Sequence, residues 1–464
     1  MKTLKGSLIA LSILLFLMSF AFAAGEKEEV LYEGKTLRLI VKDLPMLREL
    51  YPVMEKEAEN MGMNLESDWY TWEDLRKKVL LDYKAGLKNW DIIFTDEYWW
   101  FSNAGAIISI DEFINDPSIA DPNVDNWLKD TYPNAINYMT LNDKLWGFPY
   151  FSDFTVLIYR TDILKCPEEK TSFHKKYGYV LNVPKTYDQY YDIINFFTRK
   201  KGELLCGEPL EDDFYGTVHS LKPGGFLLHD YLPYALAFGI PETYYYDPET
   251  MMPVWNSPAH LKGAKFLMSL KPFMPSGVGT MTSGASTAFF AEGKIAMTIE
   301  YIGRSVLICN DPKSSKIIGK WDYTVSPSVT GTGVKGACMS NQHTMMIYTL
   351  SENKKAVYKI IERMFAPDPM KKLLFEKNLI VPRKSILESP DAKELDWAKN
   401  LSLTMDPNLT SHSYHPKFEI IPKIWDIVIP PLSEMWTEIK TPEQAFNEGQ
   451  EELVELFKEA GYIK

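Results

Sequence analysis

The sequence lacks the motifs that support covalent, phosphate or redox chemistry. It has four cysteines in 464 residues and no CxxC spacing, which excludes a redox motif and a zinc knuckle. No G-x-S-x-G, Walker or G-x-G-x-x-G motif occurs, so the parts needed for acyl transfer, phosphoryl transfer and dinucleotide binding are missing. We therefore expect no catalytic residue, no cofactor and no metal ion.

Positive charge is also scarce. The chain has 50 Lys and Arg against 62 Asp and Glu, a formal net charge of −12. Such a surface repels polyanions, which argues against nucleic acid and anionic lipid as partners.

Long apolar runs are absent after the N-terminus. Residues 1–24 combine two early lysines, an apolar run over residues 8–22 and small residues in 21–24, the pattern of a secretory signal peptide. The run is about fifteen residues, short of the roughly 20 that span a bilayer. We expect a soluble protein, exported to the periplasm or the extracellular space. Export permits disulfides. Two states of the cysteines therefore remain open: one with Cys166 paired to Cys206 and Cys309 paired to Cys338, and one with four free buried thiols.

The remaining pattern predicts an α/β fold. Short β-rich runs at 35–42, 64–70 and 91–94 alternate with helical periodicity at 45–61 and from residue 71 to Gly86. This alternation indicates a parallel sheet covered by helices, and further along the chain it resumes with strands at 155–159, 294–299, 323–325 and 344–348 and helices at 187–199, 353–365 and 442–460.

Polar and aromatic residues follow two of these strands. Ligands of open parallel sheets bind beyond the carboxyl ends of the strands, where Asp43 and the sequence Asp96-Glu97-Tyr98-Trp99 lie. Carboxylates accept hydrogen bonds from sugar hydroxyls, and aromatic rings cover the apolar face of a pyranose. The alternative is a helix start at which Asp96 or Glu97 caps free amides. His412-x-x-His415 lacks a third ligand and is expected in a surface loop.

Several phrases along the chain resemble the extracellular solute-binding proteins of bacterial ABC sugar importers, the maltose-binding-protein-like family. They are WEDLRKK (72–78), AG (85–86), WDIIF (90–94), GAIISID (105–111), LWGFPY (145–150), LIYRTD (157–162), AFFAEGKIAM (288–297), VPRKS (381–385) and TPEQA (441–445). The resemblance implies two Rossmann-like lobes joined by hinge strands, the periplasmic binding protein type II architecture. Lobe 1 would comprise residues 35–150 and about 338–385, and lobe 2 residues 151–337 and about 386–464.

The resemblance also implies ligand-binding positions. Asp153 matches the hinge carboxylate of the relatives, and Trp425 matches an aromatic that stacks on sugar. Another aromatic contact is expected from His229-Asp230-Tyr231. Where the relatives have a tryptophan, this chain has Tyr301 followed by Arg304. Tyr301 is an alternative aromatic ring for stacking on the ligand, and Arg304 would reach an acidic or strongly polar solute. This departure from the relatives argues against a maltodextrin ligand.

The resemblance therefore implies a monomeric protein that captures a carbohydrate between its lobes and delivers it to the permease subunits of an ABC importer. A polyol-binding protein of the same fold is one alternative. A secreted carbohydrate-active enzyme is another, but neighbouring Asp96 and Glu97 do not form the facing pair of carboxylates that glycoside hydrolysis needs. A sensor that partners a membrane receptor is also open.

Overall fold

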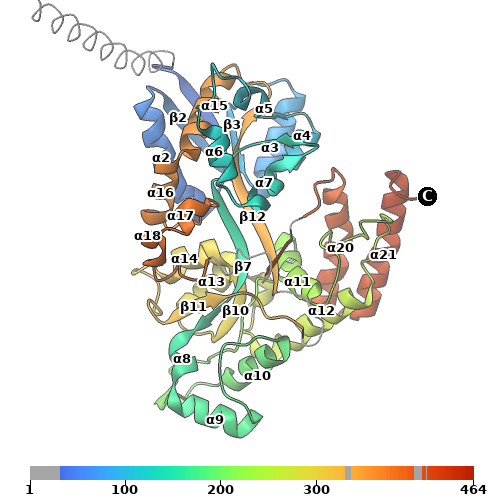
Figure 1. Ribbon diagram of the computed structural model, residues 1–464. Coiled ribbons are helices and arrows are strands. Elements are labelled where there is room, and N and C mark those ends of the chain that lie inside the picture. Colours follow the sequence, from blue (N-terminus) through green and yellow to red (C-terminus); the bar gives the residue numbers. More distant parts are fainter. Residues whose placement is uncertain (1–31, 330–335, 402–409, 414) are drawn as a thin grey trace, which may run out of the picture.

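A computed structural model of the chain shows two lobes connected by long strands (Figure 1). It describes residues 32–329, 336–401, 410–413 and 415–464. The expected signal peptide at 1–24 lies outside these residues. Within the described residues no helix combines the length and apolar character needed to cross a membrane.

The upper lobe in Figure 1 contains the first third of the chain and a later segment that returns to it. Its elements are β1 (Thr36–Lys42), α2 (Pro45–Asn60), β2 (Asn64–Tyr70), α3 (Trp72–Lys84), β3 (Ile92–Thr95), α4 (Trp99–Asn103), β4 (Ile107–Ile108), α5 (Asp111–Ile114), α6 (Val124–Lys129), α7 (Pro133–Met139), β5 (Thr140–Leu141), β6 (Lys144–Leu145), α15 (Lys354–Phe365), α16 (Pro367–Phe375), α17 (Lys384–Leu387) and α18 (Pro390–Lys393).

The lower lobe holds most of the rest. Its elements are α8 (Thr161–Lys165), α9 (Pro167–Tyr177), α10 (Tyr187–Phe197), β8 (Leu204–Leu205), β9 (Glu208–Pro209), α11 (Gly225–Ala237), α12 (Pro258–Ser269), two 3-10 turns (Lys271–Phe273 and Val278–Thr280), α13 (Ser283–Ala291), β10 (Met297–Tyr301), α14 (Ile302–Cys309), β11 (Trp321–Thr324), α20 (Ile421–Trp436) and α21 (Pro442–Glu459).

One sheet runs through both lobes because two long strands, β7 (Phe151–Arg160) and β12 (Gly336–Tyr348), belong to each. The strand order is β10-β7-β12-β3-β1-β2, with β11 on β7 and with β4 and β13 (Thr410–Ser413) on β12. β12 pairs with β7 through residues 340–343 and then with β3 through residues 344–347. The chain thus crosses between the lobes on two neighbouring strands, the arrangement of a hinge.

The expected parallel sheet is confirmed for β1, β2 and β3, but β12 joins β3 antiparallel. All ten residues of β7 are buried, consistent with a strand covered on both sides. Helix α3 begins after Thr71, whose side chain accepts from the Asp74 amide, and a capping box at Thr441 starts α21. These local signals fix where the two helices begin.

Candidate functional site

The site begins at the carboxyl ends of β1 and β3, which are neighbours in the sheet. Lys42 ends β1 and donates from Nζ to both carboxylate oxygens of Asp96 at 2.8 and 3.0 Å. Burial alone would raise the pKa of Asp96, but Lys42, His343 and a hydrogen bond from Thr95 hold it well below its usual value. Asp96 is therefore ionised and already paired with a cation.

Glu97, the next residue, has the opposite character. Its carboxylate accepts a hydrogen bond from Trp72 Nε1 at the start of α3. Burial, reinforced by the charge of Asp96, raises the pKa of Glu97 to about 8. At neutral pH its side chain is thus protonated, and it both donates and accepts hydrogen bonds.

Three tryptophans meet where the lobes face each other. The ring of Trp425, on α20, lies 5.3 Å from Trp72 with an interplanar angle of 33° and 6.5 Å from Trp100 on α4. The guanidinium of Arg76 covers Trp100 at 4.4 Å. Trp425 is only 6% exposed, so the lobes are closed on each other at this position.

Polar groups of the lower lobe continue from Trp425. Its Nε1 donates to the Tyr245 hydroxyl at 3.0 Å, which lies 3.1 Å from Nδ1 of His415. His415 Nε2 lies in turn 3.0 Å from His229 Nε2. Burial lowers the pKa of His229 to about 4 and that of His415 well below its usual value. Both imidazoles are neutral at pH 7, so one ring donates a hydrogen bond to the other.

The expectation of a surface loop at His412-x-x-His415 is wrong for His415. Its side chain is 3% exposed and stacks on Tyr245 with ring centroids 6.1 Å apart. His415, Tyr245 and Trp72 are the residues that sequence reasoning missed, because they come from segments far apart in the chain and no local pattern unites them.

The hinge contributes Asp153 from the first half of β7. Its Oδ1 accepts the backbone N–H of Gly303, at the start of α14, over 2.8 Å. Burial raises the pKa of Asp153 to about 7, although nearby Arg304 opposes the shift. A Cβ atom on Gly303 would lie 3.0 Å from this oxygen, so any larger residue would require the Asp153 carboxylate to shift by a few tenths of an ångström. Asp153 thereby connects the hinge strand to the lower lobe.

Arg304 does not offer an uncompensated charge. Its Nη1 donates to Glu300 Oε1 at 3.3 Å, and Ser286 donates to the other oxygen of Glu300 at 2.6 Å. The guanidinium also lies 5.7 Å from the ring of Tyr301. An acidic solute would therefore compete with Glu300 for Arg304.

Other predicted positions lie outside this cluster. Asp43 is exposed and pairs with Arg48 at 2.9 Å. Trp99 packs edge-on against Tyr98 and Tyr138 in the core of the upper lobe.

The segment 229–231 divides between two faces of α11. Tyr231 hydrogen-bonds with His260 at 2.7 Å and packs on Trp255 inside the lower lobe, whereas His229 faces Trp425. Residues two apart in a helix point to nearly opposite sides, which explains the split. Asp230 accepts from the Ser220 backbone.

Several buried polar atoms near the cluster have no hydrogen-bond partner among the described residues. They are Nε1 of Trp100, the hydroxyl of Tyr301 and Nδ1 of His343. Buried polar groups are normally satisfied, so these atoms are candidates for contacts with a polar guest. A surface groove opens beside Trp100 and is lined by α3, α4 and the residues preceding and beginning α20, among them Leu81 and Glu419.

The comparison with family models decides the identity. Residues 39–371 match the model of the bacterial extracellular solute-binding proteins. The chain belongs to this family. No protein with a curated description matches the sequence significantly.

Solved structures of solute-binding proteins share this fold. A protein of Agrobacterium radiobacter K84 in complex with ribitol superposes with a TM-score of 0.76 at 20% identity, covering 92% of this chain and 99% of that one. Maltose-bound MalE3 of T. maritima gives 0.73 at 18% identity, covering 91% and 100%. A protein of Agrobacterium vitis S4 with bound D-mannitol gives 0.73 at 20% identity, covering 93% and 100%. The two-lobed α/β fold is therefore shared with these solute-binding proteins.

Proposed function

We propose that this solute-binding protein captures a neutral sugar or polyol between its lobes and presents it to the permease of an ABC importer. The observation that carries the proposal is the interlobe cluster, in which tryptophans and unsatisfied polar atoms surround charges that are already paired. Rings of Trp72, Trp100 and Trp425 suit the apolar faces of a carbohydrate.

Charge balance favours a neutral guest. Lys42 neutralises Asp96, and Arg304 neutralises Glu300. Glu97 is protonated at pH 7 and His229 is neutral. Asp153, whose pKa is about 7, carries a partial negative charge at pH 7 and further disfavours an anion. Burying an ionic ligand here would therefore require it to displace a paired group, which is costly in a low-dielectric site. The hydroxyl groups of a sugar or polyol, in contrast, can form hydrogen bonds with both donor and acceptor side chains of the cluster.

The lobes supply the mechanism of delivery. Lobe 1 comprises residues 35–150 and about 338–385, and lobe 2 the remaining residues 151–337 and about 386–464. The hydrogen bonds of Ser385, on α17, with Asp130 support the boundary of lobe 1 near this residue. Twisting of β7 and β12 would open and close the cleft, and a ligand that binds both lobes shifts the population toward the closed form.

The ligand-binding residues of this proposal include most sequence candidates and add four. The candidates that remain are Asp96, Glu97, Asp153, His229, Tyr301, Arg304 and Trp425. The added residues are Trp72, Trp100, Tyr245 and His415. Asp43, Trp99 and Tyr231 shape the surroundings. The protein acts as a monomer, is exported, and neither binds nucleic acid nor hydrolyses its ligand.

A thermal-shift and calorimetric screen of the protein tests this function. Neutral mono- and oligosaccharides and polyols are compared with the sugar acids of matching size. A ligand at a hundred times its dissociation constant adds about 2.7 kcal/mol of stability. We expect a response to at least one neutral compound and none to its acid counterpart. Binding of sugar acids in preference to neutral compounds, or release of reducing ends from oligosaccharides, would contradict the proposal.

A further inference from the structure

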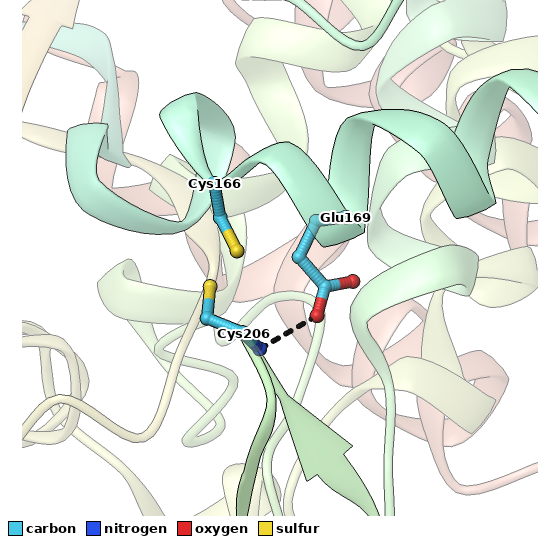
Figure 2. A group of neighbouring side chains, drawn as sticks. All are labelled: Cys166, Glu169 and Cys206. Carbon is cyan, nitrogen blue, oxygen red and sulfur yellow. Dashed lines mark hydrogen bonds between the residues drawn. The ribbon is translucent and has the colours of Figure 1, made fainter.

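Two cysteines of the lower lobe lie beside each other, away from the interlobe cluster. Cys166 is the N-cap residue of α9, and Cys206 lies in the turn between β8 and β9. Their Sγ atoms and a carboxylate oxygen of Glu169 are all within 4.8 Å of one another. Figure 2 shows the two sulfur atoms pointing toward each other. Both residues are free thiols in the structure.

The position of Cys206 is unusual for its backbone. Cys206 and Gly207 form a two-residue hairpin turn with φ values of 52° and 83°. Both central residues thus occupy the left-handed region, where Asn-Gly is the preferred pair. A cysteine is not favoured here by its backbone conformation, which points to its side chain as the reason for its presence.

A metal site fits these residues less well than a disulfide. The carboxylate of Glu169 accepts from Arg199 Nη1 at 2.8 Å, from Arg199 Nη2, and from the Cys206 N–H at 2.8 Å. Figure 2 shows the last of these bonds. A guanidinium therefore already neutralises Glu169, and a zinc ion would have only two sulfur ligands where three or four protein ligands are usual.

We propose that Cys166 and Cys206 form a disulfide bond in the exported protein. In this step the thiolate of one cysteine attacks a small-molecule or protein disulfide, forms a mixed disulfide and releases the first thiol of the oxidant. The thiolate of the second cysteine then attacks the sulfur of the first cysteine and releases the second thiol of the oxidant. Two protons and two electrons leave the pair, and the oxidant is reduced to two thiols. The inference rests on export of the family to an oxidising compartment, but not on the identity of the solute.

The bond would connect the start of α9 to the β8–β9 hairpin. It would close a loop of about 40 residues that includes α9 and α10, and closing such a loop stabilises a protein mainly by restricting the unfolded chain. Burial, with Cys166 adjacent, raises the pKa of the Cys206 thiol. The thiolate form of Cys206 is therefore disfavoured in the folded chain.

The test refolds the full mature chain in a mixture of oxidised and reduced glutathione. Free thiols are counted with a maleimide mass tag in denaturant, and linked peptides are identified by mass spectrometry without reduction. We expect two free thiols and a peptide pair joined through Cys166 and Cys206. Reduction should lower the unfolding midpoint by about 5–10 °C.

Matched variants separate the possible outcomes. Cys166→Ser and Cys206→Ser should each leave three free thiols and an unfolding midpoint that does not respond to reductant. Cys309→Ser should retain the linked peptide and the response. Four free thiols in the refolded wild type, a linkage through Cys309 or Cys338, or one zinc ion per chain that either Cys166→Ser or Cys206→Ser removes would each overturn the proposal. None of these outcomes alters the solute screen, so the two proposals fail independently.

Discussion

Replacing Trp425 by alanine should weaken closure of the lobes more than any other single truncation in the cluster. Its two ring contacts with Trp72 and Trp100 cross between the lobes, and each is worth about 0.5–1.5 kcal/mol. Their loss removes about 1–3 kcal/mol from the closed state, equivalent to a roughly 5- to 150-fold weaker apparent affinity. The contacts with Tyr245 and His415 lie within the lower lobe, so truncation of this buried ring also destabilises folding by about 3–5 kcal/mol.

The assay pairs ligand titration, followed by tryptophan fluorescence or calorimetry, with denaturant unfolding. Trp321→Ala is the matched control, because that ring is partly buried in the lower lobe and donates to Asn310 at 3.0 Å, outside the cluster. The control should lower stability and leave affinity unchanged. Wild-type affinity in Trp425→Ala, or an equal loss in Trp321→Ala, would refute the assignment of Trp425 to the interlobe contact.

Three further outcomes are expected. Gly303→Ala places a Cβ 3.0 Å from Asp153 Oδ1 and should cost about 1–3 kcal/mol of ligand-binding free energy by calorimetry; an unchanged affinity would show that the hinge contact is dispensable. The pKa of Glu97 is about 8 in the closed lobes and 4.5 for an ordinary glutamate, so closure takes up a proton and affinity should fall as pH rises from about 7.5, where ordinary histidines are mostly neutral, to about 8.5. Glu97→Gln should remove this slope, because Asp153, whose pKa is about 7, is already mostly ionised in that interval; an undiminished slope would assign it to another group. Gly263→Ala puts a Cβ 2.7 Å from the Ala235 Cα between two helices and should lower the free energy of unfolding by about 1–3 kcal/mol without changing affinity, whereas an affinity loss would connect this packing to the cleft.

Local sequence signals were sufficient for much of the upper lobe. The alternation of apolar residues and the turn residues between them predict β2 at its observed bounds and β1, α2 and α3 within a few residues. Each of these elements is specified by its own residues, because β1 is largely buried, β2 alternates exposed and partly buried residues, and the helices have one apolar face.

The long strands and α20 were harder to predict. β7 begins four residues before the expected start at Thr155 and β12 eight before Thr344. Strand pairing extends them: residues 151–154 of β7 pair with 340–343 of β12, and residues 336–339 of β12 pair with β13. Helix α20 contains Pro430 and Pro431, which argue against a helix in any reading of the sequence alone. Packing against α11 and α21 nevertheless maintains it.

The cluster itself was only half predictable. Asp96, Asp153 and Trp425 are marked by strand ends or by family resemblance, whereas Tyr245 and His415 meet across 170 positions of the chain. Tyr245 lies between α11 and α12 and His415 precedes α20, so the contact joins residues outside the regular helices and no sequence periodicity predicts it. Asp43 directly follows β1, as expected, but its exposed side chain forms an ion pair with Arg48 and does not join the cluster.

The groove beside Trp100 has a practical use. Its rims belong to different lobes, with Leu81 on α3 65% exposed and Glu419 just before α20. Dyes attached at these two positions would move relative to each other whenever the lobes rotate. The protein can therefore be made into a fluorescent biosensor whose signal reports whether the cleft holds a ligand, without any change to the ligand-binding residues.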